Sequence, residues 1–171
     1  MKPNREGAGR RPWPSPCGRH ADHTAVALAT FTAVASGQTL DKKVLSFSAA
    51  RKVAAAAQEA ARAKSVDVVI VVVDDAGYII LLERMDRAQV ASVNVSIGKA
   101  RTAAIYRRPS KDFEDQIRNG RVAALALADA TPLQGGIPIL IAGKVIGAIG
   151  VSGDSPQVDE DIAIAGAKAF P

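Results

Sequence analysis

The stretch GGIPILIAGKVIGAIGVSG, residues 135–153, predicts two β-strands joined by a tight turn at Ala142-Gly143-Lys144. Glycine inside a strand packs no side chain and costs backbone entropy, so its recurrence at Gly147 and Gly150 needs a physical reason. One reason is close approach by a ligand, a sister subunit or another backbone; the other is a cramped packing point against a helix. The series does not lead directly into a helix and carries no Gly-Lys-Ser/Thr, so we do not interpret it as a nucleotide-binding loop.

A second pair of strands is predicted upstream. Residues 68–73 are all Val or Ile, and such an unbroken apolar run favours a strand buried on both faces. The sequence Asp74-Asp75-Ala76-Gly77 then predicts a turn in which Gly77 supplies a positive φ. Residues 78–83 return as the second strand of this hairpin.

Helical segments alternate with these hairpins. Residues 122–130 are apolar and fit a strand or a helix equally well. The order of segments predicts an α/β (α+β) fold, a three-layer α-β-α sandwich with about five mostly antiparallel strands. The expected helices run from a cap at Ser46 or Ser48 to about Lys64, from Ser92 to about Tyr106, from Lys111 to Arg118 behind a cap at Ser110, and onward from Ser155-Pro156.

The composition argues against nucleic-acid binding and against a membrane-spanning segment. Hydrophobic residues make up 48% of the 171 residues but aromatic residues only 4%, which leaves few rings to stack on nucleic-acid bases. Five of the 22 Lys and Arg residues precede residue 36, so the net charge of +5 belongs partly to the N-terminus and not to a basic face. No run of 18 or more apolar residues occurs, and we expect neither a nucleic-acid partner nor a membrane span.

The N-terminal part predicts an extension followed by a secretory signal. Residues 1–40 form the extension, which we expect to be disordered at its polar start, and the apolar segment 25–35 ends in the small-residue pattern Ala33-x-Ala35. A short tail without a targeting role is the alternative. Cleavage after Ala35 would remove the only cysteine and both histidines and place the domain, residues 41–171, in the periplasm or outside the cell. Without cleavage we expect the cytoplasm.

That predicted mature domain lacks the groups on which common catalytic sites depend. Zinc centres and nucleophilic triads need imidazole or thiolate, so the sequence favours a binding protein over an enzyme. Asp74 and Asp75 could bind a metal or transfer protons, but aspartate in a tight turn more commonly fixes turn geometry. No metal ligand set is assigned.

Four other polar residues are candidates for a ligand pocket. Arg84 and Asp86 flank Met85 at a predicted strand end, where they either pair with each other or face a pocket. Lys99 and Thr102 share one face of the helix predicted over 92–106. A lysine on the sheet-facing side would be a pocket residue, whereas lysine more commonly faces solvent.

Several motifs in one order resemble the GlcG/HbpS family, whose domain is also found at the C-terminal end of PduO-type cobalamin adenosyltransferases. The resemblance covers about residues 43–170. The motifs are Val72-Val73-Asp74-x-x-Gly77, Glu83-Arg84-Met85-Asp86, Lys99-Ala100-x-Thr102-Ala103, Pro109-Ser110, Gly135-Gly136-x-Pro138-Ile139, the segment Val145 to Gly153, Asp159 and Ala165-Gly166.

The resemblance implies an α-β-α sandwich, homo-oligomers from dimers to octamers, secretion in some members and binding of haem or a related tetrapyrrole. No histidine follows the predicted cleavage site, so an iron ligand would come from Met85, Tyr78, Tyr106, Lys99 or a hydroxyl such as Thr102. The alternative is weak contact without a protein ligand to the iron. The candidate ligand-binding residues are Asp74, Arg84, Met85, Asp86, Lys99, Thr102, Gly135, Gly136, Gly147, Gly150 and Ser152.

Three functions remain open at this point. The first is an exported tetrapyrrole-binding protein, a haem carrier or an accessory of a sensor. The second is an enzyme or accessory protein of small-molecule catabolism, which requires Asp74, Arg84 and Lys99 to converge in one pocket. The third is a purely structural homo-oligomer whose glycine-rich strand packs against a sister subunit.

Overall fold

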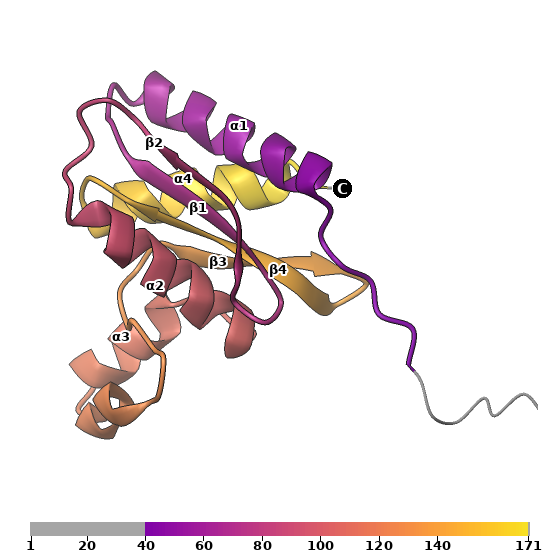
Figure 1. Ribbon diagram of the computed structural model, residues 1–171. Helices are drawn as coiled ribbons and strands as arrows, with labels where there is room; N and C mark the ends of the chain where they lie inside the picture. Colours follow the sequence, from indigo (N-terminus) through magenta and orange to yellow (C-terminus); the bar gives the residue numbers. More distant parts are fainter. Residues whose placement is uncertain (1–39, 171) are drawn as a thin grey trace, which may run out of the picture. The chain divides into compact units, whose positions relative to one another are not determined.

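The computed structural model describes residues 40–170 (Figure 1). Residues 1–39 of the expected extension, with the signal-like segment 25–35, lie outside the described residues. From Asp41 onward the chain forms one compact unit. Its elements are α1 (Phe47–Ala63), β1 (Val69–Asp74), β2 (Ile79–Arg84), α2 (Ser92–Ile105), α3 (Lys111–Arg118), the 3-10 helix η1 (Val122–Ala126), β3 (Gly136–Ile141), β4 (Lys144–Ser152) and α4 (Pro156–Lys168).

The sheet has four strands in the order β2-β1-β4-β3, and every neighbouring pair is antiparallel. The expectation of about five strands was wrong because residues 122–130 supply no strand. Val122 and Leu125 of η1 are both 63% exposed, so this apolar segment is not held against the sheet. Both predicted hairpins are confirmed, and they meet where β1 pairs with β4.

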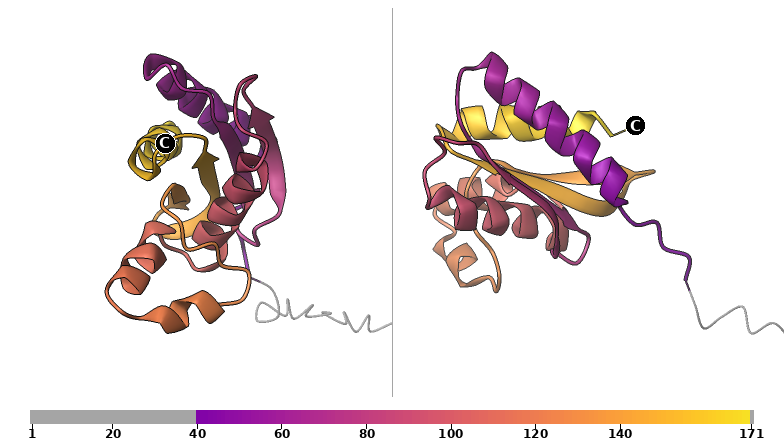
Figure 2. Two further views of the ribbon diagram at one scale, coloured as in Figure 1. Left: turned by 90° about the vertical axis from the view of Figure 1, so that its left-hand side faces the viewer. Right: turned by 45° about the horizontal axis from the view of Figure 1, so that its top comes forward.

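Helices cover both faces of the sheet, as the three-layer prediction required (Figure 2). The core on one face contains side chains of α1 and α4, and the core on the other face contains side chains of α2. Along β1, Ile70 and Val72 enter the first core and Val69, Val71 and Val73 enter the second. Two buried faces explain why this strand shows no polar alternation.

The helix starts show where a local cap suffices. Ser46 accepts a hydrogen bond from the Ala49 backbone N–H, 3.2 Å away, and α1 begins at the next residue as predicted. Ser110 does not cap α3. Its hydroxyl donates to the Leu133 carbonyl and accepts from the Gly136 N–H. The Ser110 hydroxyl thus bonds to distant backbone groups instead of the first turn of α3, and it holds the start of α3 against the start of β3.

No helix in the part of the chain that the structure describes is long and apolar enough to cross a membrane.

Candidate functional site

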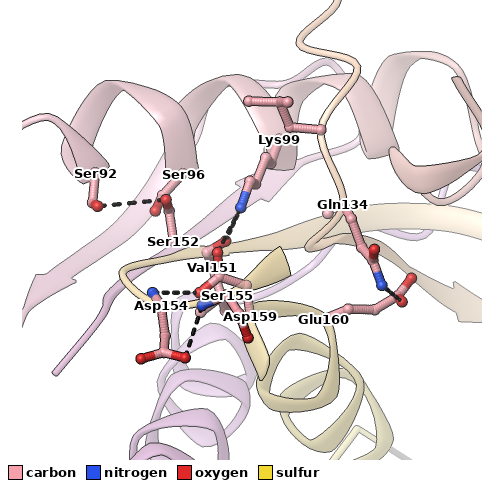
Figure 3. A network of polar contacts seen from close by, with 12 residues as sticks. Ser92, Ser96, Lys99, Gln134, Val151, Ser152, Asp154, Ser155, Asp159 and Glu160 are labelled. Carbon is pink, nitrogen blue, oxygen red and sulfur yellow. Dashed lines mark hydrogen bonds and ion pairs between the residues drawn. The ribbon is translucent and has the colours of Figure 1, made fainter. Parts of the chain in front are cut away.

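Lys99 is buried in the interior and not in an open pocket (Figure 3). Its Nζ lies 2.8 Å from Asp159 Oδ2 and 2.9 Å from the Val151 carbonyl oxygen. The two side chains are 4% and 3% exposed. Since Lys99 comes from α2 and Asp159 from α4, this ion pair links the helices on the two faces of the sheet where β4 ends.

Asp159 is held by more than the lysine. Its second carboxylate oxygen accepts the Asp154 N–H at 3.0 Å, which fixes the turn between β4 and α4. Burial raises the pKa of the Asp159 carboxyl above its ordinary 3.8, and the hydrogen bond and charge of Lys99 act in the opposite direction. Removal of either partner would leave a buried charge without compensation.

The glycines of the final hairpin are close-packed against this chain's own backbone. A Cβ at Gly150 would lie 2.5 Å from the Ala100 nitrogen of α2. A Cβ at Gly136 would collide with the Lys99 carbonyl, and one at Gly147 with the Val73 carbonyl. Gly135 has φ of 120° and lies beside the Lys99 ammonium and the Val151 carbonyl. The packing alternative therefore accounts for these four glycines without a ligand.

The buried hydroxyls near Lys99 also have partners. Ser152 Oγ lies 3.4 Å from Ser92 Oγ (Figure 3). Ser96 donates to the Val69 carbonyl at 3.0 Å. Thr102 donates to the Gly98 carbonyl and accepts the Thr131 N–H, each at 2.7 Å. The serines stabilise the contact between α2 and the sheet, and Thr102 joins α2 to the loop before β3.

An open pocket of about 400 Å³ lies instead at the end of β2. It contains Arg84, Met85 and Asp86, three of the residues that the motifs predicted together. Met85 also packs against the core beneath α1. The remaining lining residues are Gln58 and Arg62 from the last turns of α1 and Asp67 from the loop before β1.

Asp67 does not contribute a free charge to this pocket. Its Oδ2 lies 2.7 Å from Arg87 Nε, and this ion pair fixes the loop that follows β2. Sequence reasoning missed Gln58, Arg62 and Asp67, since only the packing of α1 on the hairpin brings them to Arg84. The spacing of Gln58 and Arg62 by four residues does place them on one helix face, but it gives no indication of what that face meets.

Asp74 lies at the other end of the hairpin. Its Oδ1 accepts the N–H groups of Ala76 and Tyr78, both at 2.9 Å, so it holds the turn. Arg84 pairs with Val69, five residues before Asp74, a separation of about 17 Å along the strand. Asp74, Arg84 and the buried Lys99 therefore do not converge in one pocket.

The five candidate iron ligands differ in their surroundings, and the structure places one of them in the open pocket. Lys99 and Thr102 are buried and hydrogen-bonded, and the Tyr106 hydroxyl donates to the Ala128 carbonyl at 2.7 Å. Tyr78 is 69% exposed beside the Asp74 turn. Met85 lines the pocket. Within residues 40–170, no group of three or more His, Cys, Asp or Glu side chains could hold a metal ion.

Residues 45–168 match the family model described as "Haem degrading protein HbpS-like". The chain belongs to this family. It is 41% identical over 111 residues to protein GlcG of Escherichia coli K12, an alignment that covers 65% of this chain and 83% of GlcG. The resemblance that the motifs indicated is thereby confirmed.

Solved structures of HbpS-like proteins have the same fold. A double mutant of HbpS from Streptomyces reticuli superposes with a TM-score of 0.73 at 27% identity, covering 94% of this chain and 99% of that one. The PduOC protein, solved as a haem complex, superposes with a TM-score of 0.68 at 28% identity and covers 74% of this chain and 95% of that one. A structural neighbour of this chain has thus been solved with haem bound.

The pocket at Arg84 and Met85 fits part of a haem. Thioether sulfur is an established axial ligand of haem iron, and guanidinium groups match the carboxylates at the edge of the macrocycle. Five of the six lining residues are polar or charged, so within this chain the pocket does not supply two apolar walls. The donor set therefore fits the iron and the carboxylates of a tetrapyrrole, and the chain's own lining leaves most of the macrocycle uncovered.

Proposed function

We propose that this protein binds haem or a related tetrapyrrole at the pocket formed by Gln58, Arg62, Asp67, Arg84, Met85 and Asp86. The observation that carries the proposal is the position of Met85. It is the candidate iron ligand whose side chain lines an open pocket, and two arginines line the same pocket. Membership of the HbpS-like family and the similarity to haem-bound PduOC support this choice of ligand.

In this arrangement each residue has one task. Met85 would hold the iron through its sulfur, Arg62 and Arg84 would neutralise the ligand's negative charge, and the Arg87–Asp67 pair fixes the loop after β2. When bound, haem would supply redox chemistry at its iron. The protein's own contribution is to hold and orient the ligand.

A titration of the full chain with hemin tests the proposal. We expect a saturable shift of the Soret band with one hemin per chain, and a changed band position in Met85→Ala because an axial ligand is lost. Tyr78→Phe is the matched control, since Tyr78 lies beside the opposite turn and should leave the spectrum unchanged. A wild-type spectrum that stays identical to that of free hemin at saturation would refute tetrapyrrole binding.

We propose in addition that the protein is exported and acts as a haem carrier or an accessory of a sensor. The support is the signal-like composition of residues 25–35. Expression of the full chain in a bacterium, followed by fractionation and intact-mass measurement, should find a periplasmic or secreted form that begins at Ser36. A full-length form confined to the cytoplasm would contradict export and leave the binding proposal standing.

A homo-oligomer is the assembly we propose for this protein. Strand β2 lies at an edge of the sheet, and its Ile79 and Leu82 are 49% and 36% exposed. Exposed apolar side chains on an edge strand are suited to pairing with a second copy.

A further inference from the structure

We infer that Arg62 and Arg84 form a carboxylate-binding subsite within the pocket at the end of β2. The identity of the ligand as a tetrapyrrole rests on the proposed function, whereas the preference for a carboxylate rests on the residues of the pocket. Arg62 comes from the last turn of α1 and Arg84 is the last residue of β2. Both line the same pocket of about 400 Å³. Two separate elements therefore bring two guanidinium groups to one opening.

The charges around this opening favour an anion. Among the described residues, neither Arg62 nor Arg84 takes part in an ion pair. The pocket also contains Asp67 and Asp86, but Arg87 already neutralises Asp67 at 2.7 Å. An excess of one positive charge remains, which is the charge that a single carboxylate would balance.

The chemistry of the lining selects a carboxylate over a simple point anion. A planar guanidinium offers parallel N–H donors that match both oxygens of a carboxylate. Gln58 lies one helical turn before Arg62 and adds an uncharged amide that can donate to the same ligand. Met85 supplies the one apolar side chain of the lining, suited to the carbon skeleton that carries the acid.

Two sources could supply this carboxylate. One is a propionate arm of a tetrapyrrole, and the other is a free small carboxylic acid. Hemin, hemin dimethyl ester and succinate distinguish them, because the ester keeps the macrocycle and removes the negative charges, whereas succinate has the charges without the macrocycle.

The experiment compares these three probes on the full wild-type chain, Arg62→Gln, Arg84→Gln and the control Arg51→Gln. Arg51 lies on the same helix outside this pocket and gives the same change of charge. Hemin and its dimethyl ester are titrated by absorbance in one mixed solvent. Succinate is followed by the thermal midpoint at constant ionic strength. The midpoints of the ligand-free proteins establish that each variant is folded.

We expect hemin to bind about tenfold more weakly to each pocket variant and with unchanged affinity to Arg51→Gln. Hemin dimethyl ester should bind wild type more weakly than hemin does, and equally to all four proteins. An ester that binds wild type as tightly as hemin, or a loss of affinity as large in Arg51→Gln, would overturn the subsite while tetrapyrrole binding stands.

The succinate titration separates failure of the subsite from failure of the proposed function. If hemin does not bind but succinate raises the midpoint of wild type and not of the pocket variants, the subsite is supported and the tetrapyrrole proposal fails. If wild type responds to neither probe, both are refuted.

Discussion

Lys99 shows how one buried charge can organise three elements. Its ammonium holds the first turn of α4 through Asp159 and the end of β4 through the Val151 carbonyl. The absence of side chains at Gly135 and Gly136 lets the start of β3 pass beside it. The same residue that was a candidate for ligand binding therefore acts within the fold.

Loss of one member of this pair should be costly. Lys99→Met leaves the Asp159 carboxylate buried without its partner, and we expect the free energy of unfolding to fall by about 3–5 kcal/mol. Denaturant unfolding measures the change. Lys64→Met is the matched control because the Lys64–Asp161 pair is 40% and 41% exposed, so its loss should cost less than about 1 kcal/mol.

The double variant Lys99→Met/Asp159→Leu provides a further check. With both charges removed, most of the lost stability should return, because no uncompensated charge remains in the interior. Equal losses for the buried and the exposed lysine would contradict the role that we assign to burial.

Gly150 gives a second test at a single position. Gly150→Ala would place a Cβ against the backbone of α2, which cannot move aside without lifting the helix, and we expect a loss of about 1–3 kcal/mol. Gly143→Ala has no neighbour within 4 Å of the new Cβ, and only its φ of 76° disfavours the change, by about 1 kcal/mol. Thermal unfolding of both variants compares steric overlap with backbone strain, and a larger loss at Gly143 would reverse our interpretation.

Among the secondary-structure elements, the β1–β2 hairpin has two ends with different tasks. The Asp74 turn is closed by hydrogen bonds to its own backbone, whereas the other end opens into the pocket of Arg84 and Met85. Helix α1 completes that pocket because Gln58 and Arg62 extend from its C-terminal turns over the strand ends. A ligand bound there would contact the hairpin and α1 together.

This division predicts opposite effects of substitutions at the two ends of the hairpin. Asp74→Ala removes the acceptor of two backbone N–H groups and should lower stability by about 1 kcal/mol without changing hemin affinity. Arg84→Ala should weaken hemin binding and leave the thermal midpoint within about 1 °C of wild type, since Arg84 is exposed. Calorimetry measures the stability of both variants, and absorbance titration measures their hemin affinity. Weaker hemin binding by Asp74→Ala would indicate that Asp74 belongs to the ligand site.

For the molecule as a whole, the sheet leaves β2 at one edge and β3 at the other. Pro138 lies within β3 and cannot donate a ladder hydrogen bond, whereas β2 contains no proline. We therefore expect any pairing between copies to involve β2 and not β3.

Light scattering of the full chain tests the assembly. We expect a mass that is a multiple of 17.8 kDa at micromolar concentration, and a lower mass for Leu82→Lys, which places a charge on the exposed edge. Leu140→Lys on β3, where Leu140 is 49% exposed, is the matched control and should leave the mass unchanged. A wild-type monomer would remove the oligomer proposal.

Local sequence was sufficient for most of the secondary structure. The Val and Ile run, the Asp74–Gly77 turn, the Ser46 cap and the limits of α3 depend on contacts within a few residues, so their patterns identified them. Residues 122–130 were different because their apolar composition fits several conformations. In the structure Val122–Ala126 form a 3-10 helix that takes no part in the sheet.

For the candidate site, too, the sequence predicted what depends on nearby residues and not what depends on distant ones. Motif positions brought Arg84, Met85 and Asp86 together because these residues are consecutive. The sequence could not distinguish the buried Lys99 from a solvent-facing lysine, because its partner Asp159 is 60 residues away. Nor could it place Arg62 and Arg84 in one pocket, since they line it together only when α1 packs on the hairpin. The sequence by itself determined the properties that depend on residues close together in the chain. Burial, charge pairing and pocket formation were decided by the tertiary structure, because they require distant segments to meet in the folded state.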